Sequence, residues 1–148
     1  MILEDILFQP YTGEFKLIDP NGRSHSKYYD VAKTLLSLDT FYELFYFDEF
    51  QLDADKDMDN VSIDFHQPQT VEVYRDMSER FWAFLRGNAA KFFPGDPDWE
   101  KRLVLLNGLQ NLAIVMFHLI KHQKEDRAIG FLLMGIRKLS QALDSQHP

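Results

Sequence analysis

Residues 5–38, which begin the fold, read DILFQPYTGEFKLIDPNGRSHSKYYDVAKTLLSL. Two short apolar runs, 5–8 and 14–18, are separated by a segment whose proline and glycine favour a turn. A proline and an Asn-Gly pair then end the second run, because proline cannot donate a hydrogen bond to a sheet. Apolar side chains follow at helical spacing, namely Val31, Ala32, Leu35 and Leu36. The pattern predicts a β-hairpin followed by a helix over about residues 28–38.

The rest of the chain is predicted to be mainly helical. Residues 49–53 and 61–65 indicate a second hairpin, whereas the aromatic run 41–47 leaves helix and strand open. Three more helices are expected over about residues 70–86, 97–121 and 125–144, the first two with Thr70 and Asp96 as N-caps. No linker divides the 148 residues, so we expect a single domain. The expected fold class is α+β, mostly α, with two small hairpins and four main helices.

Apolar spacing also predicts which helix faces turn inward. The expected buried stripes are Val73, Met77, Phe81 and Phe84 on the 70–86 helix, and Ile129, Leu132, Ile136, Leu139 and Leu143 on the last helix. The 97–121 helix is apolar on most sides between residues 112 and 120, which is typical of a helix buried all round.

Composition and charge exclude several classes of protein. An apolar content of 45% with 14% aromatic residues suits a globular core, and the lack of cysteine excludes disulfides and thiolate metal sites. A net charge of −7 argues against a nucleic-acid partner. The first residues lack the basic segment of a signal peptide, and the apolar run 112–120 is shorter than the roughly 20 residues of a membrane span. We expect a soluble, cytoplasmic protein without a membrane partner.

Three side-chain patterns suggest chemistry, but each has a simpler interpretation. The acidic run 53–59 has the oxygen spacing of a calcium loop, yet a methionine stands where that loop needs glycine, and a solvated hairpin tip explains it better. His118 and His122 lie four residues apart on a helix without the glutamate of a zinc protease, so a core position and a helix C-terminus are favoured. His25 lies between two serines in a polar loop without a nucleophile elbow.

Asp19 ends the second apolar run, just before a Pro-Asn-Gly segment. A carboxylate at a strand end can hold Mg²⁺, which takes one or two carboxylates together with phosphate oxygens and water. The same position also suits an aspartate that only initiates a turn. The residues alone leave both interpretations open.

The order of these motifs resembles a family of small-molecule kinases. Residues 5–8, 12–22 and 28–38 are similar to the stretch after the catalytic loop in aminoglycoside phosphotransferases and choline kinases. The resemblance is nearest to the sugar phosphotransferases associated with capsule or polysaccharide genes. In that family an N-I-L strand, a turn and an I-D-P-R-G segment precede a helix that begins Y-D-L-A-K-L. Residues 122–128 and 131–133 are similar to the family's closing helices.

The resemblance implies part of a protein-kinase-like C-lobe with a partial magnesium–phosphate site. Asp19 matches the family's magnesium-binding aspartate. Asp5 falls where the family has the catalytic-loop asparagine, a second magnesium ligand, so it departs from the pattern while keeping an oxygen ligand. The implied cofactor is Mg²⁺, bound together with ATP. Asp30 matches an aspartate whose implied role is mainly structural.

Two parts of the family's machinery are missing. The base that accepts the substrate proton belongs to a His-Gly-Asp-type motif before the Asp5 position, and residues 1–4 do not complete it. The chain also has no room for a nucleotide lobe. We therefore expect an incomplete or degenerate phosphotransferase that is inactive alone, and whose exposed N-terminal hairpin associates with itself or with a partner chain. The alternative is a non-catalytic, acidic helical protein with an interaction or regulatory role.

Overall fold

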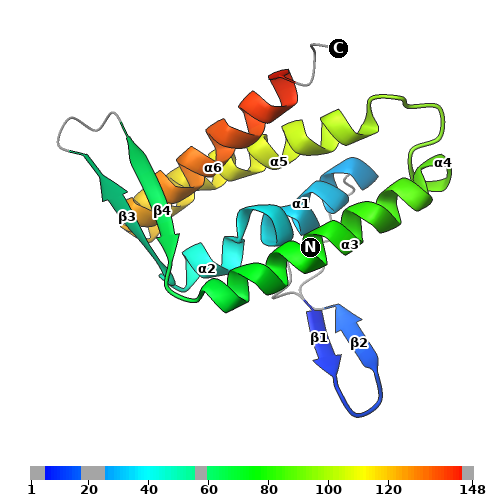
Figure 1. The fold of residues 1–148 in the computed structure, drawn as a ribbon, viewed down its shortest axis with the longest axis horizontal. Helices are drawn as coiled ribbons and strands as arrows, with labels where there is room; N and C mark the ends of the chain where they lie inside the picture. The colour runs from blue at the N-terminus through cyan, green and yellow to red at the C-terminus, as the bar shows by residue number, and fades with distance from the viewer. Residues whose placement is uncertain (1–5, 18–25, 56–59, 145–148) are drawn as a thin grey trace.

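The computed structural model describes residues 6–17, 26–55 and 60–144. In sequence order its elements are β1 (Ile6–Gln9), β2 (Glu14–Leu17), α1 (Lys27–Thr40), α2 (Tyr42–Tyr46), β3 (Phe50–Ala54), β4 (Val61–Phe65), α3 (Pro68–Gly87), α4 (Ala89–Phe92), α5 (Trp99–Met116), the π-helical turn η2 (Phe117–Lys121) and α6 (Glu125–Asp144) (Figure 1). The predicted class, α+β and mostly α, is confirmed, and α1, α3, α5 and α6 are the four main helices.

The two hairpins form separate two-stranded antiparallel sheets. In the first, Ile6 pairs with Leu17, and Gly13 has a left-handed φ of 72° that closes the turn and brings its N–H to the carbonyl of Gln9. Figure 1 shows this hairpin projecting from the helical part of the molecule below α3. The second hairpin pairs Phe50 with Phe65.

Two predicted helix caps are wrong. Thr70 lies inside α3, which begins at Pro68, and its hydroxyl donates a hydrogen bond to the side-chain oxygen of Gln67. Asp96 lies before α5, whose N-cap is Asp98, and it accepts a hydrogen bond from the N–H of Asp98 instead. In both cases the polar side chain forms a local turn adjacent to the helix start, which sequence spacing does not distinguish from a cap.

The core consists of two apolar clusters. One joins α1, α3, α5 and the residue after α4 through Ala32, Leu35, Leu85, Phe93, Trp99 and Leu103. The other consists of Phe45, Phe50, Phe131 and Met134. Phe45 is fully buried, and its ring centroid lies 4.7 Å from that of Phe50 and 5.0 Å from that of Phe131. The aromatic run 41–47, left open by the sequence, is therefore the short helix α2 that contributes to this second cluster.

The inward face predicted for α3 is only partly correct: Phe81 packs against the first core cluster, but the other three predicted residues do not face inward. Val73, Met77 and Phe84 are exposed, whereas Val71 and Leu85 are buried. The face that turns toward α1 carries Ser78 and Trp82, whose polar atoms bond to Asp39. The inner side of α3 thus combines buried apolar side chains with polar contacts to α1.

Helices α5 and α6 pack against each other in antiparallel directions, and their outer faces differ from the prediction. Met116 on α5, and Ile136 and Leu143 on α6, are exposed rather than buried, and Leu109 on α5 is exposed as well. Within the described ranges, one helical stretch, Trp99–Lys121, is long and apolar enough to cross a membrane. Its most apolar 18 residues have a mean hydropathy of 1.8, and 33% of them are buried. A core helix of a globular protein has the same length and composition, so this stretch alone decides nothing about membranes.

Candidate functional site

The predicted magnesium ligands, Asp19 and Asp5, both lie outside the described residues, as does His25. Residues 56–59 of the acidic run also lie outside them. In the ranges 6–17, 26–55 and 60–144, no three histidine, aspartate or glutamate side chains gather in a way that could hold a metal ion.

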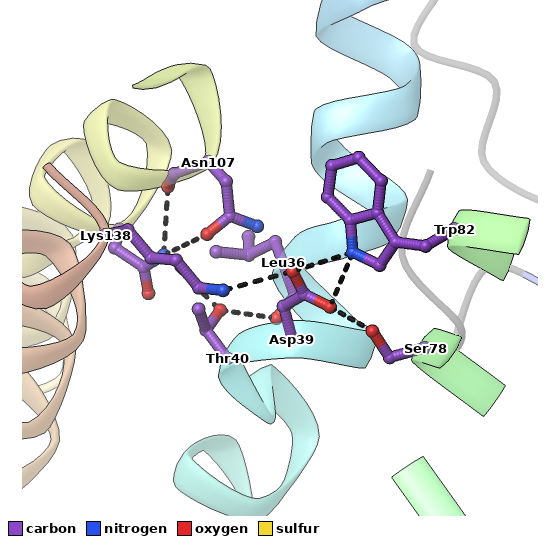
Figure 2. Close-up of polar contacts among 8 residues, drawn as sticks. Leu36, Asp39, Thr40, Ser78, Trp82, Asn107 and Lys138 are labelled. Carbon is purple, nitrogen blue, oxygen red and sulfur yellow. Dashed lines mark hydrogen bonds and ion pairs between the residues drawn. The ribbon is translucent and has the colours of Figure 1, made fainter. Parts of the chain in front are cut away.

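A polar cluster centred on Asp39 lies between α1, α3 and α6. The Asp39 side chain is only 8% exposed, and one carboxylate oxygen forms an ion pair of 3.1 Å with the amine of Lys138. The hydroxyl of Ser78 donates to the other oxygen, and the indole N–H of Trp82 lies 3.2 and 3.3 Å from the two oxygens. Figure 2 shows the carboxylate between Lys138 on one side and Ser78 and Trp82 on the other.

A second group of polar side chains connects α1 with α5 beside this cluster. The amide nitrogen of Asn111 donates to the hydroxyl of Thr40 at 3.3 Å and to the side-chain oxygen of Asn107 at 3.1 Å. Thr40 in turn donates to the carbonyl of Leu36 at 2.7 Å. All these polar groups are buried, so each hydrogen bond compensates part of their desolvation.

An open cavity of about 320 Å³ borders the Asp39 cluster, with Arg75, Glu79, Arg137 and Gln141 among its lining residues. Both oxygens of Asp39 already accept hydrogen bonds, and the hydroxyl of Ser78 gives its proton to the same carboxylate. Trp82 and Lys138 also bond to this carboxylate, so it joins side chains of α3 and α6 to α1. The arrangement fits a polar connection among three helices.

Sequence reasoning missed this cluster, because its members are far apart along the chain. Asp39 lies 39 residues from Ser78, 43 from Trp82 and 99 from Lys138. The available signal is weak: Lys138 lies next to the apolar positions of α6, where a buried lysine needs a carboxylate partner.

His118 lies in the core, as predicted, and is fully buried in η2. Its ring stacks on Phe131 at a centroid distance of 4.9 Å, and neither ring nitrogen has a hydrogen-bond partner among the described residues. Burial, with smaller contributions from Arg127 and His122, lowers the pKa of His118 to about 4. The ring is therefore neutral at neutral pH. His122, 5.4 Å away by ring centroid, follows the C-terminus of η2, as predicted.

Asp48 connects the segment before β3 to the start of α6. Its carboxylate accepts two hydrogen bonds from the guanidinium of Arg127, at 2.5 and 2.8 Å, and one from Lys124 at 3.1 Å. Arg127 and Lys124 together hold the pKa of Asp48 at about 2, below its ordinary value, against the opposing effect of desolvation. These contacts fix the position of α6 relative to α2 and β3.

Comparison of the chain with known protein families, with curated proteins and with solved structures finds no match. The kinase resemblance of residues 5–38 therefore remains a prediction from the sequence.

Proposed function

We propose that the chain is an incomplete phosphotransferase-like domain, inactive alone, that carries a partial magnesium–phosphate site at Asp19 and Asp5. The observation that carries the proposal is the register of the first hairpin, in which Ile6 pairs with Leu17. Asp5 directly precedes Ile6, and Asp19 follows Leu17 by two residues, so both aspartates are attached to the same end of this hairpin.

Two further features support the proposal. The resemblance implies a hairpin, an aspartate and then a helix, and β1, β2 and α1 have that order. Carboxylate oxygens are ligands that Mg²⁺ prefers, and in phosphoryl transfer the ion neutralises charge on the phosphates. Residues 1–4 do not contain the family's His-Gly-Asp-type motif, and phosphoryl transfer also needs a nucleotide lobe and a catalytic base in addition to the two aspartates.

The test is the thermal unfolding of the chain with Mg²⁺ and ATP. We expect MgCl₂ with ATP to raise the melting temperature of the natural sequence, because a ligand that binds only the folded state stabilises it. Asp19→Asn should abolish the shift, and Asp5→Asn should reduce it. Asp53→Asn, on the exposed surface of β3, is the control and should keep the full shift. An unchanged melting temperature of the natural sequence would contradict the proposal.

A second candidate function is a non-catalytic interaction protein. It is favoured by the exposed leucine, isoleucine and methionine side chains along α5 and α6, in a chain whose net charge is −7. The two candidates give different results in the same titration, because an interaction protein shows no Mg²⁺–ATP shift and yet associates with another protein chain.

A further inference from the structure

Six apolar side chains lie exposed along the outer side of α5 and α6. We call this surface the α5–α6 apolar face and define it by Leu105, Leu109, Met116, Leu132, Ile136 and Leu143. Their exposed fractions range from 39% to 61%. On each helix the members are spaced four and seven residues apart, which places them in one row along that helix.

The two rows lie on the same side of the helix pair. A Cβ on Gly108 would meet Leu139 and the Gly135 carbonyl, and a Cβ on Gly135 would meet Leu112 and the Gly108 carbonyl. The antiparallel pair therefore has a local two-fold axis between the two glycines. This axis is perpendicular to the plane of the two helices, so a rotation about it exchanges α5 with α6 and keeps each side of the pair where it is. The rotation brings positions 105, 109 and 116 onto positions 132, 136 and 143. The rows form one continuous surface.

The opposite sides of these helices pack against the rest of the protein. Asn107 and Asn111 on α5 are buried beside Thr40 of α1, and Phe131 and Met134 on α6 belong to the second core cluster. The apolar face is therefore the side of the pair that the rest of the described chain leaves uncovered.

Charge does not oppose contact between two such faces. No charged residue occurs between positions 103 and 120 or between positions 128 and 136. Two copies of a chain with net charge −7 repel each other in general, and this surface is one where they can approach without placing like charges in contact.

The exposed area is sufficient for a specific contact. Side chains of this size present roughly 200 Å² when fully exposed, so these six leave roughly 600 Å² open on each chain. Two copies joined through this face would bury roughly 1,200 Å² from these residues alone, which is the lower end of the range for stable interfaces.

We infer that the α5–α6 apolar face is the interface between two copies of this chain, in which two helices of each copy form a four-helix bundle across a two-fold axis. The inference deepens the second candidate function by naming the partner. It places self-association on a surface other than the N-terminal hairpin predicted from the sequence. Because it does not involve Asp19 or Asp5, the Mg²⁺–ATP titration can fail without affecting it.

The test is the molar mass of the full chain in solution, measured by light scattering and sedimentation over a range of concentrations. We expect twice the 17.4 kDa of one chain. Leu109→Glu and Ile136→Glu should each weaken dimerisation at least tenfold, because each buries an unpaired carboxylate in the interface. Far-ultraviolet circular dichroism and melting temperature show whether these variants remain folded.

The matched control is Phe84→Glu, because Phe84 is exposed to a similar extent, 51%, but lies on α3. It should dimerise like the natural sequence. A second control is Tyr11→Glu at the tip of the first hairpin, where the side chain is exposed. If this variant alone loses the dimer, association occurs through the hairpin and the inference is overturned.

Two other results would also overturn it. A chain that stays monomeric at all concentrations has no such interface. A monomer that floats with phosphatidylcholine vesicles, and that loses this property with Ile136→Glu, would show that the face binds a lipid surface instead of a second copy.

Discussion

Gly108 and Gly135 face each other where α5 crosses α6, and the carbonyl oxygen of each lies 3.2 Å from the position that a Cβ on the other would occupy. The two backbones are therefore as close as residues without side chains allow. This contact sets the separation of the helix pair, and it leaves the apolar rows beside the glycines on the outer surface.

An alanine at either glycine should separate the helices. In Gly108→Ala the new methyl group would lie 2.9 Å from a Leu139 methyl carbon, and we expect a loss of about 1–3 kcal/mol in the free energy of unfolding. The control is Gly87→Ala near the end of α3, where nothing lies within 4 Å of the new Cβ and a gain of about 0.5–1 kcal/mol is expected. Urea unfolding measures both. Equal effects of the two substitutions would contradict the close contact.

The ion pair between Asp39 and Lys138 should contribute more to stability than the exposed pairs do. Lys138→Met leaves the Asp39 carboxylate largely buried without its cation, and we expect a loss of about 2–4 kcal/mol. Arg80→Ala, which removes an exposed pair with Asp76, should leave the free energy of unfolding almost unchanged.

The double variant Asp39→Asn with Lys138→Met distinguishes the ion pair from simple packing. It should recover part of the loss, because no unpaired charge remains buried. Trp82 fluorescence reports whether the cluster keeps its structure, since its indole bonds directly to Asp39. A double variant as unstable as the sum of the single variants would argue against coupling of the two residues.

His118 should make the protein less stable as the pH falls from about 6.5 to 4. Its pKa is about 4 in the folded state and near 6.5 in the unfolded state, so the unfolded chain binds more protons in this interval. The loss should approach about 3 kcal/mol at pH 4. His118→Phe removes the titrating group and should flatten the dependence, whereas His66→Gln, at an exposed position, should not. Identical pH profiles of His118→Phe and the natural sequence would refute this.

Asp48 should also contribute to the free energy of unfolding, and this contribution should be lost at a lower pH than that of His118. Its folded pKa of about 2 lies below the ordinary value of 3.8, so its stabilisation is present at neutral pH and is lost as the pH falls from about 4 to 2. Because the Asp48 side chain is half exposed, we expect Asp48→Asn to cost below about 1 kcal/mol at pH 7. Thermal unfolding at pH 7 and pH 2 measures the difference. A variant that costs as much at pH 2 as at pH 7 would contradict the role of the ion pair.

Much of the local structure could be predicted from the sequence. The first hairpin follows from two short apolar runs around a turn with Gly13, and α6 has the predicted limits of residues 125–144. The predicted positions of His118 and His122 are also confirmed. These predictions succeed because hydrophobic spacing and turn residues act within a few positions along the chain.

The sequence by itself determined the order of hairpins and helices, because backbone preferences and periodicity are local. The tertiary structure alone decided which side of each helix is buried. Val73 and Ile136 have the spacing of core residues, yet both are exposed, because the burial of a side chain depends on which element covers it. The tertiary structure also assembled the Asp39 cluster, because only packing brings a carboxylate on α1 to an amine on α6 that lies 99 residues further along the chain.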